Sequence, residues 1–274
     1  MAVACPPVID IGLNLTHKSF QSDLPQVVDR AIAVGVAQMI LTGTTLAGSE
    51  EACSLAERFP GRMYSTAGIH PHHASEFNAE TLAELKELAA KKTVVAIGEC
   101  GLDFFRNYSP QDEQRSCFRE QLELAKELGL PVFLHERDAH EAFAEILEPA
   151  VASLQGAVVH CFTGNPASLH QYLEMGCFIG VTGWVCDERR GGELRELVPE
   201  IPLDRLMIET DAPYLSPRDL RPKPKSTRNE PCHLPHIGKV IAELRGIDYT
   251  TLARSTTENA RRFFGLNEKD GTLL

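Results

Sequence analysis

The sequence lacks any apolar run long enough to cross a membrane. A spanning helix needs about 18 or more consecutive apolar residues, and no stretch of the chain approaches that length. The opening MAVACPPVID also lacks the charged start and the long apolar segment of a signal peptide. The eight cysteines form no C-x-x-C pair and no cluster, which favours reduced thiols over a disulfide framework. We expect a cytosolic monomer with no membrane partner.

An excess of positive charge is also absent. The 27 lysines and arginines are outnumbered by 38 acidic residues, which leaves a formal net charge of −11. Such a chain does not adhere broadly to duplex DNA or to anionic membranes, because both are negatively charged. A local basic groove remains compatible with this composition.

Short apolar segments recur along the chain, and their starts lie 21 to 37 residues apart, which suits a strand, a helix and two loops. They are Val8–Gly12, Met39–Gly43, Tyr64–His70, Val94–Glu99, Pro131–His135, Ala157–Phe162, Phe178–Thr182 and Leu206–Asp211. Helical patterns lie between and after them, for example at Gln111–Leu128 and Thr250–Phe264. Eight such units predict a single (β/α)8 TIM barrel over residues 1–274. The alternative is a doubly wound sheet, which usually carries a G-x-G-x-x-G loop that this chain lacks.

Polar residues end most of the apolar segments, and in a barrel all the carboxyl ends of the strands lie on one face. Glu99, His135 and His160 end the fourth, fifth and sixth segments. Their oxygen and nitrogen atoms suit Zn²⁺, Mn²⁺ or Mg²⁺. One histidine alone would more often be a core residue or a helix cap, but three donors on successive strands predict a site for a divalent ion.

The eighth segment ends in two carboxylates, Glu209 and Asp211, on the same face of the strand. Asp211 is interpreted as a metal ligand or as the base that accepts a proton from metal-bound water; its alternative role is to cap the next helix. Glu209 is interpreted either as a group that contacts the substrate or as a buried ion-pair partner.

The first and third segments supply further candidates. Asp10 and Asn14 leave the first strand, where we expect a weaker metal contact from Asp10 and a substrate contact from Asn14. His70 continues the third strand and is expected in the site as a catalytic group. His72 and His73 are expected to be solvent-facing loop residues.

A basic loop follows the last strand. The segment SPRDLRPKPKSTRNEP contains Arg218, Arg221, Lys223, Lys225 and Arg228. Barrel loops after the seventh and eighth strands often bind phosphate, and these side chains donate charge-assisted hydrogen bonds to it. We expect this loop to bind substrate phosphates, with a plain solvated loop as the alternative.

Aromatic side chains occur close to these predicted loops. Trp184 follows the seventh strand, beside Arg189 and Arg190, and Phe104, Phe105 and Tyr108 follow the fourth. Such rings can stack on the bases of single-stranded nucleic acid, or they can pack into the core.

Eight motifs occur in series over nearly the whole chain. They are DIGLNLT, STAGIHPH, VVAIGECGLDF, PVFLHERDAH, GAVVHCFTG, GVTGWVCDERRG, IETDAPYL and RNEP. Together they resemble the TatD-related family of metal-dependent deoxyribonucleases. The resemblance implies an amidohydrolase-like TIM barrel and divalent-metal-dependent hydrolysis of phosphodiester bonds in DNA, with 3′-to-5′ exonuclease action on single strands in some members. We expect an exonuclease of this polarity that acts on single-stranded DNA or RNA. It implies metal ligands at Glu99, His135 and His160, and the late aspartate of the family at Asp211.

This chain differs from many relatives in the opening motif. They carry D-x-H-x-H, whereas this chain has Gly12 and Asn14 in place of the two histidines. We therefore expect one firmly held ion, with a second held loosely or brought by the substrate. Mg²⁺ or Mn²⁺ is expected to support activity, and Zn²⁺ is expected to fit the same site.

Two other functions remain open from the sequence. The same barrel supports hydrolysis of C–N or ester bonds in a small molecule or an aminoacyl-nucleic acid, although the carbamylated lysine common in such enzymes is replaced here by Glu99. A non-enzymatic adaptor is the other, and the complete donor set argues against it.

Overall fold

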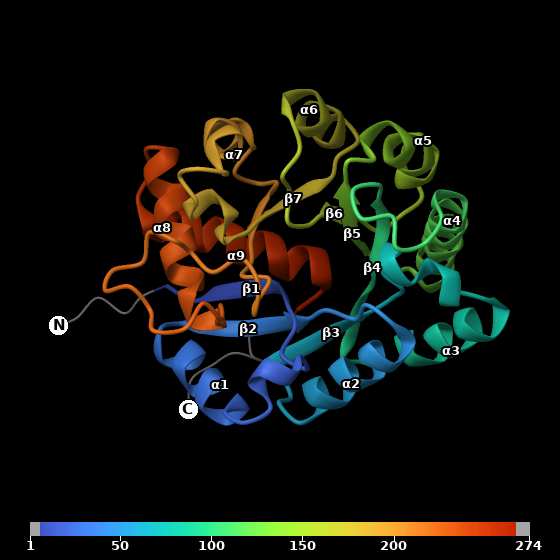
Figure 1. The fold of residues 1–274 in the computed structure, drawn as a ribbon, viewed down its shortest axis with the longest axis horizontal. Helices are drawn as coiled ribbons and strands as arrows, with labels where there is room; N and C mark the ends of the chain where they lie inside the picture. The colour runs from blue at the N-terminus through green and yellow to red at the C-terminus, as the bar shows by residue number, and fades with distance from the viewer. Residues whose placement is uncertain (1–5, 267–274) are drawn as a thin grey trace.

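Eight parallel strands lie in chain order in one sheet in the computed structural model, which describes residues 6–266 (Figure 1). They are β1 Val8–Leu13, β2 Val36–Leu41, β3 Met63–Ala67, β4 Val94–Asp103, β5 Val132–Arg137, β6 Ala157–Val159, β7 Phe178–Val181 and β8 Leu206–Ile208. Just past the last strand, the Asp211 amide donates to the Gly12 carbonyl at 2.9 Å, which links the exits of β8 and β1. The predicted (β/α)8 barrel is confirmed, and the doubly wound alternative is wrong.

Most helices surround the strands on the outside of the barrel, and the last one passes across the ring of strands in this view (Figure 1). The α-helices are α1 Leu24–Ala33, α2 Leu46–Glu57, α3 Ala79–Ala89, α4 Gln111–Leu128, α5 His140–Val151, α6 Pro166–Glu174, α7 Gly192–Leu197, α8 Leu234–Leu244 and α9 Tyr249–Phe264. Short 3-10 helices are η1 Lys18–Phe20, η2 Pro71–Glu76, η3 Gly183–Cys186, η4 Val198–Glu200 and η5 Pro231–His233. Within the described residues, no helix combines the length and apolar character needed to cross a bilayer.

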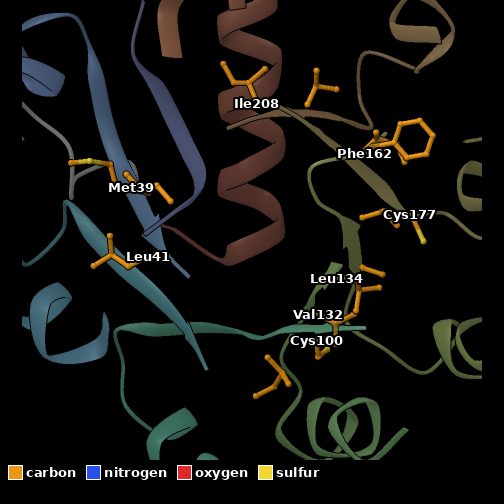
Figure 2. Close-up of a cluster of buried hydrophobic side chains, with 14 of the residues drawn as sticks. Met39, Leu41, Cys100, Val132, Leu134, Phe162, Cys177 and Ile208 are labelled. Carbon is orange, nitrogen blue, oxygen red and sulfur yellow. The ribbon is translucent and has the colours of Figure 1, made fainter. Parts of the chain in front are cut away.

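Most of the buried apolar side chains fill the layer between the strands and the outer helices. Figure 2 shows part of this cluster, to which Met39 and Leu41 of β2 and Val132 and Leu134 of β5 contribute. Cys100 is among the buried residues drawn there, and the cysteines within residues 6–266 are all free thiols. Cysteine here serves chiefly as a small apolar side chain.

A second cluster fills the inside of the barrel at the amino ends of the strands. It contains Phe133, Val158 and Met207 from the strands, and Phe263 and Phe264 from α9. Successive side chains of a strand point to opposite faces, so residues two positions later point inward as well. His135, His160 and Glu209 stand two positions after these strand residues, which directs them into the barrel above its apolar floor.

Candidate metal centre

Glu99 is the centre of a group of histidines on the carboxyl-end face of the barrel. Its side chain is buried, and its Oε1 atom lies 2.7 Å from His160 Nε2, 3.0 Å from His135 Nδ1 and 3.3 Å from His70 Nε2. One donor atom each from His70, Glu99 and His135 lies within 4.8 Å of the others. The structure thus brings together the donors that the sequence predicts on β3 to β6.

The charge of this group suits a cation. Burial alone would raise the pKa of Glu99, but His160 and His70, with hydrogen bonds from His135 and His160, hold that pKa well below its usual value. Burial would lower the pKa of His160, yet the carboxylates of Glu99 and Glu209 raise it well above the usual value. The centre therefore attracts positive charge, and two imidazoles and a carboxylate are ligands that divalent transition ions accept.

Asp211 lies beside this centre in a left-handed backbone conformation, with a φ of 53°. Asn14 Nδ2 donates to its Oδ1 atom at 3.2 Å. Burial, together with the charges of Glu99 and Glu209, raises the pKa of Asp211 to about 7. No helix of the described chain begins directly after Asp211, so the alternative role of a helix cap is wrong.

His160 and His135 each lie close to a second carboxylate besides Glu99. Glu209 Oε2 lies 3.3 Å from His160 Nδ1, and the Cys161 amide donates to Glu209 Oε1 at 2.5 Å. Asp103 Oδ2 lies 3.5 Å from His135 Nε2. Glu209 thus orients the His160 imidazole through a hydrogen bond, whereas Asp103 faces His135 Nε2 as a charge partner at ion-pair distance.

Sequence reasoning missed Asp103 because β4 continues four residues beyond its predicted end at Glu99. The signal was present, since residues four apart in a strand share a face. The expectation for His72 was wrong for the same reason: its Nε2 atom lies 2.7 Å from Asp103 Oδ2, and its ring lies 4.2 Å from the ring of His70. His73 lies at the surface as expected, with Nδ1 2.9 Å from Glu76.

Because Gly12 has no side chain, the Glu209 carboxylate can occupy the space beside it. A Cβ atom at position 12 would lie 2.3 Å from Glu209 Oε2 and 2.8 Å from Phe133 Cζ. A Cβ atom at Gly180, on the other side, would lie 2.6 Å from Glu209 Oε1. The position at which many relatives carry a histidine therefore has no room for any side chain in this arrangement.

Asp10 lies at the seam of the barrel. Its buried carboxylate accepts hydrogen bonds from the Thr210 amide at 2.9 Å and the Thr210 hydroxyl at 2.6 Å. Burial raises the pKa of Asp10 to about 8. These bonds join β1 to the segment after β8, so the side chain that was expected to give a weaker metal contact has both oxygens engaged.

The basic loop divides into two parts. Arg218, Arg221, Lys223 and Lys225 are exposed, and Arg218 Nε lies 3.1 Å from Asp187 Oδ2. Arg228 instead is half-buried at the base of the loop.

The donors of Arg228 are directed at protein atoms. Its guanidinium donates to Asp23 Oδ1 and Oδ2 at 2.8 and 2.7 Å and to Glu230 Oε1 at 2.7 Å. In contrast to its expected contact with phosphate, Arg228 fastens the loop to the segment before α1.

Comparisons with known proteins agree with this geometry. The family model described as TatD related DNase matches residues 9–265. A protein of Erwinia billingiae named 3'-5' ssDNA/RNA exonuclease TatD is 58% identical over 259 residues, covering 94% of this chain and 99% of that protein. A protein of the same name from Rahnella sp. is 55% identical over 262 residues, covering 96% and 100%.

Solved structures show the same architecture. The TatD homolog YJJV of Escherichia coli k12 superposes with a TM-score of 0.87 at 28% identity, over 97% of this chain and 100% of that chain. A TatD family hydrolase of Entamoeba histolytica gives a TM-score of 0.86 at 26% identity, with the same coverage. From its motifs, its barrel and its match over nearly the full length, this chain belongs to the TatD related DNase family.

Proposed function

We propose that this protein is a divalent-metal-dependent exonuclease that removes nucleotides from the 3′ end of single-stranded DNA or RNA. The observation that carries the proposal is the Glu99 carboxylate with three histidine nitrogens within 3.3 Å of one of its oxygens, on the face where barrel enzymes hold their active sites. The printed names of the bacterial relatives supply the polarity and the class of substrate.

Glu99, His135 and His160 would hold the ion, with Asp211 beside them. When bound, a divalent ion lowers the pKa of a water ligand and polarises the phosphoryl group, and Mg²⁺ or Mn²⁺ is the proposed activator. One firmly bound ion is proposed, because Glu209 fills the place of the first-strand histidine at Gly12.

The remaining residues act on the proton and on the phosphates. Asp211, whose pKa of about 7 suits a base at neutral pH, takes the proton of the attacking water, and Asn14 orients its carboxylate. Burial lowers the pKa of His70 to about 4, and the His72 amide donates to its Nδ1 atom, so the neutral ring carries its proton on Nε2, 3.3 Å from Glu99 Oε1. Once Glu99 holds the ion, this N–H donates to a non-bridging phosphate oxygen. The exposed cations at Arg218, Arg221, Lys223 and Lys225 contact the backbone phosphates.

The test is the digestion of 5′-labelled single-stranded DNA and RNA with Mg²⁺ or Mn²⁺, with and without chelator. The wild type shortens the labelled strand one nucleotide at a time from the 3′ end, chelator stops the shortening, and Glu99→Gln reduces it to background while the circular dichroism spectrum is retained. Glu76→Gln is the matched control, because Glu76 is a surface carboxylate that also contacts a histidine. Near-normal activity of Glu99→Gln would refute the site. No release from any oligonucleotide would favour hydrolysis of a C–N or ester bond.

A further inference from the structure

A groove of about 870 Å³ lies on the same face as the metal centre. We propose that it binds the bases of the nucleotides on the 5′ side of the scissile phosphate, which rests on the nuclease function proposed above. The groove is formed by the carboxyl end of β5, by residues after β4, β5, β6 and β7, and by the first two turns of the helices that follow. Its volume lies in the range of sites for small organic groups, about 300 to 1,000 Å³.

The groove has an aromatic ring with an arginine over it on each of two sides. Arg137 lies 4.1 Å from the centre of the Phe105 ring, and Arg190 lies 4.4 Å from the Trp184 ring. Phe105 follows β4 and Trp184 follows β7, so the strand order places β5 and β6 between them. Flat rings and guanidinium planes are the groups on which unpaired bases stack, and they do so with little regard to sequence.

Exposure of Phe105 supports a role in binding. Its side chain is 52% exposed, although burial of a phenylalanine would be worth roughly 1.5–3 kcal/mol. Tyr108, 66% exposed, follows in the same loop. Large exposed aromatic side chains beside a polar site are typical of contact surfaces.

The groove is lined by the chain segments that directly follow two of the metal-centre histidines. Its lining residue Arg137 stands two positions after His135, and Thr163 stands three positions after His160. A nucleic-acid strand whose terminal phosphodiester lies at Glu99 can therefore leave the barrel along this groove.

The charge of the residues that line the groove favours contact with bases over contact with phosphates. Three arginines face five carboxylates there, namely Arg115, Arg137, Arg190, Glu136, Asp138, Glu141, Glu145 and Glu193. Such a surface repels a phosphate chain, whereas uncharged bases offer amino and imino donors to carboxylates.

The cations for the phosphates lie next to the groove. Asp187 Oδ2 contacts Arg190 of the groove at 2.7 Å and Arg218 of the basic loop at 3.1 Å. This shared carboxylate sets the base-binding wall and the phosphate-binding loop side by side. A single strand can then present its bases to one and its backbone to the other.

The binding test uses single-stranded oligonucleotides with 2-aminopurine at defined positions from the 3′ end, added to the metal-free protein in chelator. Stacking of the internal 2-aminopurine quenches its fluorescence in the wild type, and Phe105→Leu removes the quenching and weakens binding about tenfold, within the range reported for loss of one stacked base. The control is Val34→Ala, which removes an exposed apolar side chain, 38%, at the end of α1 and away from the carboxyl-end face. Equal quenching in Phe105→Leu and the wild type, or equal loss in both variants, would overturn the proposal.

A kinetic test separates this inference from the proposed function. With the metal-loaded protein, Phe105→Leu and Trp184→Leu raise KM for oligonucleotides about tenfold but do not change KM for an abasic oligonucleotide of the same length, since that strand has no bases to stack. If both variants cleave oligonucleotides with wild-type KM, the groove proposal fails while the nuclease stands. If the wild type cleaves neither substrate, the proposed function fails first.

Discussion

Replacing Gly12 with alanine tests the arrangement that distinguishes this site. The added Cβ atom would lie 2.3 Å from Glu209 Oε2, whereas ordinary contacts begin at 3.4 Å. Glu209 cannot easily retreat, because it contacts His160 and Cys161 on one side and has Gly180 close on the other. We therefore expect the substitution to displace Glu209 and to release the imidazole that it orients.

The substitution should change both the stability of the fold and the affinity for the metal ion. Forcing one extra carbon into a packed interior costs about 1–3 kcal/mol of unfolding free energy. Loss of a carboxylate that orients a metal-binding histidine typically lowers metal affinity about 10- to 100-fold. Urea denaturation of the metal-free protein measures the first quantity, and competition with a metal-sensitive dye measures the second.

Gly192→Ala is the matched control. Gly192 is the first residue of α7, and a Cβ atom there would meet nothing within 4 Å, so both measurements should stay close to those of the wild type. If Gly12→Ala matched the wild type in stability and in metal affinity, the reasoning that Glu209 excludes a side chain at position 12 would be refuted.

Three further predictions concern the ligand surroundings and the loop. Asp103→Asn lowers metal affinity about 10- to 100-fold by loosening His135, measured by dye competition, and an unchanged affinity would contradict this. Burial alone would lower the pKa of His135, but its contacts with Asp103 and Glu99 raise it, so a bound ion must displace a proton from this ring. The affinity of the protein for the metal ion should therefore rise with pH. Calorimetry in buffers of different ionisation enthalpy should detect the released proton. Arg228→Met costs about 1–2 kcal/mol at neutral pH. Arg228 lowers the pKa of Asp23 from 3.8, and together with Arg30 it lowers the pKa of Glu230 from 4.5. The difference in unfolding free energy should therefore shrink in urea denaturation as pH falls below those values, and a constant difference would argue against the ion pairs.

The barrel and the principal donors were predictable from the sequence. Regular spacing of apolar segments indicates strand–helix units, and parallel strands in one barrel bring Glu99, His135 and His160 to one face whatever the details of the loops. Strand ends were predicted less well, because a strand ends where its hydrogen-bonded neighbour ends. β4 pairs with β5 as far as Asp103 with Arg137, which no local pattern at Glu99 reveals.

What the sequence determined by itself was therefore the set of elements and the side chains that each delivers to the carboxyl-end face, because both depend on periodicity and on residue type. Only the tertiary structure decided how those side chains are used. Arg228 is basic and lies in a basic loop, yet two carboxylates from separate elements hold it in the scaffold. Gly12 looked like a lost ligand, yet it is the space that lets Glu209 reach His160. Both roles depend on contacts across the barrel seam, between Asp23 and Arg228 and between Gly12 and Glu209, and only the closed barrel brings those residues together.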